Sequence, residues 1–266
     1  MNTVITEQSE QKRGLSGSSL KLIALITMLI DHVGAGILGR LMMARGFMDI
    51  ASAGGMAASI WLQENAELYY GYLVMRKIGR IAFPIFVFLI VEGFQRTRSK
   101  EKYVLRMAVF ALLSEIPFDL VFKGQILEFA YQNIFFTLLI GLLTMLCFDF
   151  IERTDWNGLL QLLAYGATLV AGLGLAELLK TDYGAKGVIC IMVVYIFRRN
   201  RFVQLVAGAI SFLWEMPASL AFLPIAFYNG TRGLKLKYIF YVFYPLHLLI
   251  IYVISVIMGI SGYPAG

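Results

Sequence analysis

The sequence predicts an all-α integral membrane protein, a multi-pass helical bundle of about nine transmembrane helices. Of its residues, 59% are hydrophobic and only 15% are charged, whereas an ordinary soluble domain carries about 25% charged residues. The mean hydropathy is +0.74. Apolar stretches also recur along the chain at about the 20-residue length that a helix needs to cross a bilayer. This composition excludes a soluble enzyme, a disordered chain and a nucleic-acid-binding protein.

The polar residues are concentrated outside these stretches. Residues 1–19 are polar and contain no apolar core or cleavage pattern of a signal peptide, so we expect a cytoplasmic N-terminal segment. Residues 20–266 then form a single membrane-embedded domain. The net charge of +6 is expected from cytoplasmic loops, because positive residues accumulate on the cytoplasmic side of membrane proteins.

Seven stretches are predicted as spans from their length and hydropathy alone. In chain order they are 20–38, 78–94, 103–122, 134–150, 159–179, the shorter 184–197, and 238–258. Residues 40–76 are predicted as the longest outer loop, in which the patch from Gly54 to Ala58 is either re-entrant or a surface helix.

The apolar stretch 202–228 is ambiguous because Glu215 and Pro217 interrupt it. If it forms two short spans, the chain has nine crossings and 15 of the 23 basic residues lie on the cytoplasmic side. If it forms one span, the basic residues divide 12 against 11. The positive-inside rule therefore favours nine crossings.

Few ionisable residues fall at membrane depth, where a charge costs about 2.5–3.5 kcal/mol and indicates a functional site. Asp31 and His32 lie near the middle of the first span, and His247 lies at a similar depth in the last. Glu115 is central in the third span, and Asp119 follows one turn later. Several prolines lie within or beside the spans, and such prolines open cavities between helices.

Histidine suits proton transfer at neutral pH because its unperturbed pKa is about 6.5. We predict His32 as a general base, tuned by Asp31, which could instead pair with Arg80. Side chains of adjacent residues point about 100° apart on a helix, so Asp31 and His32 do not stack. Interhelical hydrogen bonding is the structural alternative for both His32 and His247.

Six ordered sequence blocks together resemble the TraX family of membrane acetyltransferases, from about residue 20 to 252. They are KLIALITMLIDH at 21–32, GRIAFPIFVFLIVEGF at 79–94, SEIPFD at 114–119, NIFFT at 133–137, DYGAKG at 182–187 and FYPLHL at 243–248. The resemblance implies transfer of an acetyl group from cytoplasmic acetyl-CoA to an amine or hydroxyl in the bacterial plasma membrane. The implied acceptor is a pilin-like peptide N-terminus or a surface glycan or lipid.

Residue roles follow from combining this resemblance with the depth of each side chain. The expected catalytic residues are His32, Asp31, Arg80, Glu115 and His247, with no metal. The basic run expected to hold the phosphates of CoA is Arg96, Arg98, Lys100 and Arg106, together with Lys102, although these residues could merely set topology. The acceptor side is expected to include Asp119, Asn133 and Lys186, the last of which could equally snorkel outward.

One function from another class fits many of the same residues. A proton- or ion-coupled secondary transporter also uses buried histidines, buried acids and proline-broken helices. We find no internal duplication of broken helices, which such transporters commonly show. The sequence therefore favours an acyltransferase.

Overall fold

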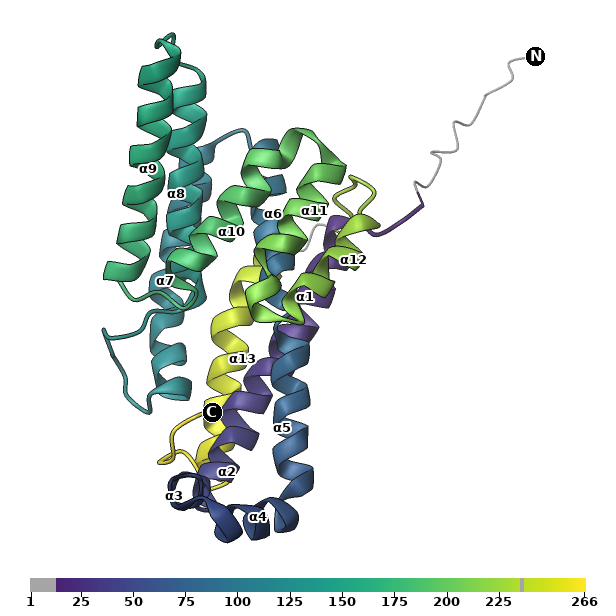
Figure 1. Cartoon of the computed structure of the whole chain (residues 1–266), viewed down its shortest axis with the longest axis vertical. Coiled ribbons are helices and arrows are strands. Elements are labelled where there is room, and N and C mark those ends of the chain that lie inside the picture. Colours follow the sequence, from purple (N-terminus) through teal and green to yellow (C-terminus); the bar gives the residue numbers. More distant parts are fainter. Residues whose placement is uncertain (1–12, 235–236) are drawn as a thin grey trace, which may run out of the picture.

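The computed structural model describes residues 13–234 and 237–266, and its regular elements there are helical (Figure 1). Most of the N-terminal segment 1–19 lies outside the described residues. The α-helices of eight or more residues are α1 Gly17–Val33, α4 Gly55–Glu64, α5 Ala66–Gly79, α6 Ala82–Arg96, α7 Lys100–Phe122, α8 Ile134–Glu152, α9 Gly158–Leu178, α10 Gly184–Ile196, α11 Arg201–Ser211 and α13 Lys237–Ile257.

The first span is longer than its apolar sequence indicates. Ser16 caps α1 by accepting a hydrogen bond from the Ser19 amide at 3.2 Å. A π-helical turn, η1 Gly34–Gly39, and the short α2 Arg40–Ala44 continue the helix, so that it runs unbroken from Gly17 to Ala44. Such π-helical turns are rare and often mark functional sites, and this one begins two residues after His32.

Three helices of the described chain are long and apolar enough to cross a membrane by themselves: Gly17–Ala44, α8 and α9. The predicted span 78–94 instead straddles two helices, because α5 ends at Gly79 and α6 begins at Ala82. The predicted loop 40–76 is also largely helical, since it contains α3 Phe47–Ala53, α4 and most of α5. These helices join at the lower end of the molecule in Figure 1.

The stretch 202–228 does not form two membrane-length helices, so the described chain does not show the nine spans that were expected. Only α11, with 11 residues, is a regular helix of any length there, and 3-10 turns and the five-residue α12 Phe222–Ala226 follow it. The segment nevertheless doubles back, because Arg201 Nη2 donates to Ile225 O at 2.6 Å. Leu15 then forms a backbone bridge with Tyr228. The segment therefore starts and finishes at the end of the bundle where α1 begins.

The helices pack around one apolar core. α13 lies against both α1 and α7, and α8 lies against α7, α9 and α10. α6 contributes many of the buried side chains, among them Ile85, Val87, Phe88 and Val91. The α8–α9 pair projects beyond the rest of the bundle at the top of Figure 1. Because α1 packs against α6 and α13, and α13 packs against α7, polar residues on neighbouring helices meet inside the bundle.

Candidate active site

The two histidines of the chain, predicted separately at mid-depth, form a hydrogen-bonded pair. His32 Nδ1 and His247 Nε2 lie 2.6 Å apart, and the two rings are stacked with an interplanar angle of 2°. His247 is 5% exposed, and its Nδ1 lies 2.7 Å from Phe243 O. The pair therefore joins α1 to α13 through side chains 215 residues apart.

The hydrogen-bond partners of this pair determine which ring nitrogens carry the protons. A carbonyl oxygen can only accept, so His247 Nδ1 carries the proton in its bond to Phe243 O. In a neutral His247 the other nitrogen, Nε2, is then the acceptor, and His32 Nδ1–H donates to it. His32 Nε2 is left with a lone pair. This chain of contacts fixes the tautomer that a general base requires.

His32 lines a partly open cavity of about 260 Å³ between α1, α5, α6 and α7. Aromatic side chains form much of its wall, including Phe83, Phe118 and Phe122. The charged and polar residues that line it are Asp31, His32, Arg76, Arg80, Lys123, Tyr131, Asp182, Tyr183 and Tyr244. A small cavity with few convergent polar groups in an apolar wall is the usual form of a reaction site.

Asp31 pairs with Arg76 and not with Arg80. The Arg76 Nη1–Asp31 Oδ2 distance is 2.6 Å, and Arg80 Nη1 instead lies 3.0 Å from Glu215 Oε1. Arg76 was expected in the outer loop, whereas it lies within α5. Gly79 permits the close approach of α5 to α1, because a Cβ at this position would overlap Asp31.

Two further contacts at the cavity, one polar and one aromatic, were not expected from the sequence. Tyr131 OH donates a short hydrogen bond to Asp182, and Tyr183 stacks on Phe83 with ring centroids 3.8 Å apart. Asp182 and Tyr183 do fall in one of the six sequence blocks, which is the signal that could have identified them. Tyr131 and Glu215 carry no comparable signal.

Glu115 and Asn133, expected in the catalytic and acceptor sites, bind each other outside this cavity. Asn133 Nδ2 donates to Glu115 and to Ala111 O at 2.9 Å, while Asn133 Oδ1 caps α8 by accepting from the Phe135 amide. This geometry fixes the start of α8 against α7. Neither residue lines the cavity of His32.

Asp119 and Lys186, also expected on the acceptor side, likewise make contacts outside this cavity. Asp119 accepts from the amide of Glu128 at 2.7 Å and so holds the loop after α7. Lys186 Nζ lies 4.8 Å from the centroid of the Trp214 ring, in a cation–π contact. Neither side chain lines the cavity of His32.

A second cavity, of about 620 Å³, adjoins the first. Four residues line both cavities: Met28, Phe86, Ile134 and Tyr244. The second cavity extends along α6 toward the end where α1 begins, and its apolar part includes Leu89, Ile90 and Leu138. We call it the basic-mouthed cavity, because five cations line it: Lys21, Arg96, Arg98, Arg106 and Arg232.

The charge of the basic-mouthed cavity is only partly compensated. Glu92 is its only lining carboxylate in the described part of the chain, and it pairs with Arg96 at 2.8 Å. Arg106 Nε is buried without a hydrogen-bond partner. An orphaned guanidinium N–H at a cavity wall is expected where an anionic group binds.

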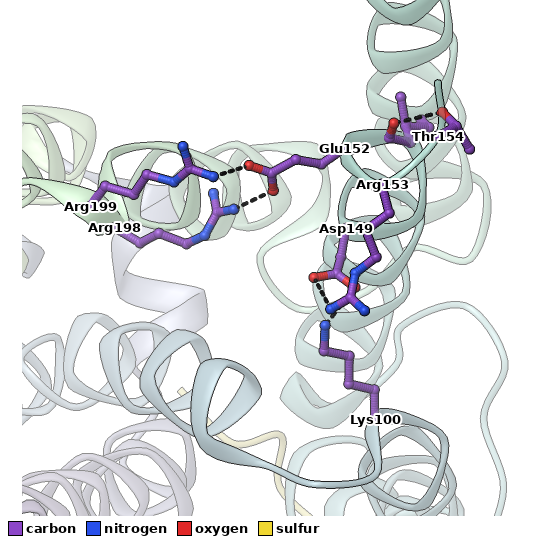
Figure 2. A network of polar contacts seen from close by, with 8 residues as sticks. Lys100, Asp149, Glu152, Arg153, Thr154, Arg198 and Arg199 are labelled. Carbon is purple, nitrogen blue, oxygen red and sulfur yellow. Dashed lines mark hydrogen bonds and ion pairs between the residues drawn. The ribbon is translucent and has the colours of Figure 1, made fainter. Parts of the chain in front are cut away.

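Lys100, expected beside these arginines, lies elsewhere. Its Nζ is 2.5 Å from Asp149 Oδ2 on α8, where Arg153 also binds (Figure 2). On the other side of α8, Arg198 and Arg199 both bind Glu152. Lys100 therefore ties the start of α7 to α8 and does not line the basic-mouthed cavity.

Comparison with known proteins identifies one family whose model matches the chain and one similar protein. The model of a family described as "TraX protein" matches residues 16–255. The chain is also similar to the "Probable fimbrial assembly protein FimC, serogroup H1" of Dichelobacter nodosus, at 25% identity over 248 residues. That similarity covers 83% of this chain and 86% of the relative. No solved structure matches the chain.

Proposed function

Since the chain belongs to the TraX family, we propose that it transfers an acetyl group from acetyl-CoA to an amine or hydroxyl acceptor within the bacterial plasma membrane. The observation that carries this proposal is the hydrogen bond from His32 Nδ1 to His247 Nε2, which leaves His32 Nε2 as a base at the wall of a polar cavity. The same cavity adjoins the basic-mouthed cavity, whose cations and apolar lining suit the acyl donor, acetyl-CoA.

The reaction requires one base and one positive group. The acceptor nitrogen or oxygen attacks the carbonyl carbon of the acetyl thioester while His32 Nε2 takes its proton. The C–S bond then breaks, and the CoA thiolate leaves and takes a proton from the His32 imidazolium. Arg80, which lines the cavity near Glu215, is the group assigned to the negative oxygen that develops on the carbonyl.

His247 acts through His32 and does not touch the reacting atoms. It accepts from His32 Nδ1–H, so it holds the imidazole in one tautomer and one orientation. A buried carboxylate has the same role in hydrolase triads, where its loss costs about 10⁴-fold in rate. His247 is therefore a positioning residue in this proposal, and Asp31 positions Arg76.

In this proposal acetyl-CoA enters at the cationic end of the basic-mouthed cavity. Arg96, Arg98 and Arg106 would bind the phosphates of CoA, and the apolar part of the cavity would hold the pantetheine arm. Ten residues of α6 separate Arg96 from Phe86, a rise of about 15 Å, and this length suits an extended arm whose thioester reaches His32. By the positive-inside rule the basic end faces the cytoplasm, which supplies acetyl-CoA.

The name of the relative and the lining of the cavity support two classes of acetyl acceptor. The relative is named as a probable fimbrial assembly protein, and this supports a pilin-like peptide with a free amine as one acceptor. A hydroxyl of a surface glycan or lipid is the other. Both would reach His32 from the opposite side of the cavity, past Lys123 and Phe122.

The proposal is tested by measuring CoA release from acetyl-CoA with detergent-purified protein and simple amine and hydroxyl acceptors. We expect release by the wild type and by Thr27→Val, a control on α1 whose hydroxyl bonds only to its own helix. We expect none by His32→Ala, which should still bind CoA. Release by His32→Ala at the wild-type rate contradicts the assignment of the base. A wild-type protein that does not bind CoA, yet moves protons or ions across vesicles, contradicts the proposed activity.

A further inference from the structure

A groove separate from both cavities runs between the start of α7 and the α8–α9 pair. It has a volume of about 880 Å³ and is lined by the loop residues after α6, by α8 and by α9. We call it the α8–α9 groove. It shares only Thr97 and Arg98 with the basic-mouthed cavity and no residue with the cavity of His32.

One end of the α8–α9 groove is cationic. Lys100 Nζ and Arg153 Nε converge on Asp149 Oδ2, at 2.5 Å and 3.1 Å, so two cations share one carboxylate (Figure 2). Arg98 also lines this end, is exposed, and has no carboxylate within ion-pair distance in the described chain. The second acid, Glu101, accepts from Ser99 Oγ at 3.1 Å. With three cations and two acids, this end carries a net positive charge.

The other end of the groove is apolar. Leu146 and Phe150 of α8 line one side, and Ala164 and Ala167 of α9 line the other. Residues three apart lie on the same face of a helix, so these two alanines leave a continuous hollow where larger side chains would fill it. From Leu146 to Arg153 the helix rises about 10 Å, which separates the apolar end from the cationic one.

The groove faces the region where lipid is expected. α8 and α9 are both long and apolar enough to span a membrane, and only 11% of the apolar window of α9 is buried by protein. Trp156, which is 41% exposed, joins the cationic end between α8 and α9. Tryptophan and arginine are among the residues that anchor helix ends at the headgroup level of a bilayer.

We infer that the α8–α9 groove binds one anionic phospholipid of the inner leaflet. Its phosphate binds at Arg153, Lys100 and Arg98, and an acyl chain lies along Leu146, Phe150 and the two alanines. A soluble phosphate compound would use only the cationic end, whereas a lipid uses the whole length. Because Thr97 and Arg98 also line the basic-mouthed cavity, the bound lipid supports one wall of that cavity.

The test is native mass spectrometry of the detergent-purified full chain, titrated with phosphatidylglycerol or with phosphatidylcholine of the same acyl chains. We expect the wild type to retain one phosphatidylglycerol molecule in clear preference to phosphatidylcholine. Arg153→Gln should lower the affinity for phosphatidylglycerol about fivefold, the effect expected of one basic residue near an anionic lipid surface. The matched control is Arg199→Gln, because Arg199 also binds an acid of α8 but lies outside the groove. It should leave the affinity unchanged.

A second variant tests the apolar end without changing charge. Ala167→Phe should fill the hollow and abolish the retained lipid, and Ala164→Leu serves if the first variant unfolds in lipid-free detergent. Equal losses in Arg153→Gln and Arg199→Gln would overturn the inference in favour of general surface charge. The inference would also be overturned if both filled variants retain the lipid. It would be overturned as well if glycerol phosphate binds the wild type as tightly as phosphatidylglycerol does.

Discussion

The substitution Gly79→Ala, which adds one methyl group, tests whether the close packing of α5 against α1 positions the residues of the site. A Cβ at Gly79 would overlap Cβ and Cγ of Asp31, far inside the 3.4 Å at which ordinary contacts begin. Relief requires α5 and α1 to separate by about 1 Å, because Asp31 Cβ is fixed to the backbone and no rotation of the side chain moves it. Overpacking of this kind costs about 1–3 kcal/mol, partly offset by about 1 kcal/mol from the better helix propensity of alanine.

The effect on catalysis should exceed the effect on stability. Asp31 is adjacent to His32 on α1, so a shift of about 1 Å at Gly79 also moves the base, and such a misplacement costs about 100-fold in rate. We therefore expect Gly79→Ala to release CoA about 100-fold more slowly, while its thermal unfolding midpoint falls by only a few degrees.

The matched control for Gly79→Ala lies on the same helix. At Gly71 a Cβ would meet only Leu38 Cδ2, at 3.5 Å, so Gly71→Ala should retain the wild-type rate and melt at or slightly above the wild-type temperature. Rates of CoA release and thermal unfolding curves are measured for both variants. If Gly79→Ala matches Gly71→Ala in both assays, the close approach of α5 to Asp31 does not position the site.

Four further substitutions separate catalytic, donor-binding and structural roles. His247→Phe should lower the rate of acetyl transfer about 10²- to 10⁴-fold with unchanged CoA binding, measured by turnover and by CoA titration. Arg106→Gln should raise the KM for acetyl-CoA with little change in kcat, because Arg106 lines the basic-mouthed cavity and not the cavity of His32. Glu115→Gln should keep near-wild-type turnover, because the glutamine oxygen can still accept from Asn133; a large loss would contradict its structural role. Arg40→Met should destabilise the protein by about 2–3 kcal/mol in denaturation experiments, since Arg40 is 1% exposed and donates four hydrogen bonds, to α7, to α13 and to the segment after α13.

The helices that could be predicted are those whose apolar residues form one uninterrupted run. The predictions 134–150 and 159–179 agree with α8 and α9 to within about two residues. The stretch 202–228 is equally apolar, but Arg201 binds the Ile225 carbonyl and turns the chain back within a short distance. Hydropathy measures whether a residue avoids water, and it does not distinguish one long helix from short helices joined by turns.

The site was predictable as a set of residue types but not as a set of partners. Depth alone identified His32 and His247, because ionisable groups inside a membrane are costly and rarely incidental. Their mutual hydrogen bond joins residues 215 positions apart, and one sequence contains no signal for such a contact. Arg76 was assigned to a loop because hydropathy falls around it, whereas it lies within α5 and forms an ion pair with Asp31.

The ion pairs around the cavity bear on the choice between the proposed acetyl transfer and proton transport. A transporter needs acids that load and release protons along a path, yet Asp31 is paired with Arg76 and Glu215 with Arg80. Asp182 accepts from Tyr131. With these acids engaged, the lone pair of His32 is the base that the cavity offers to a bound molecule. The arrangement therefore favours chemistry at one nitrogen atom, and substitution of His32 should be far more damaging to turnover than neutralisation of any one of these acids.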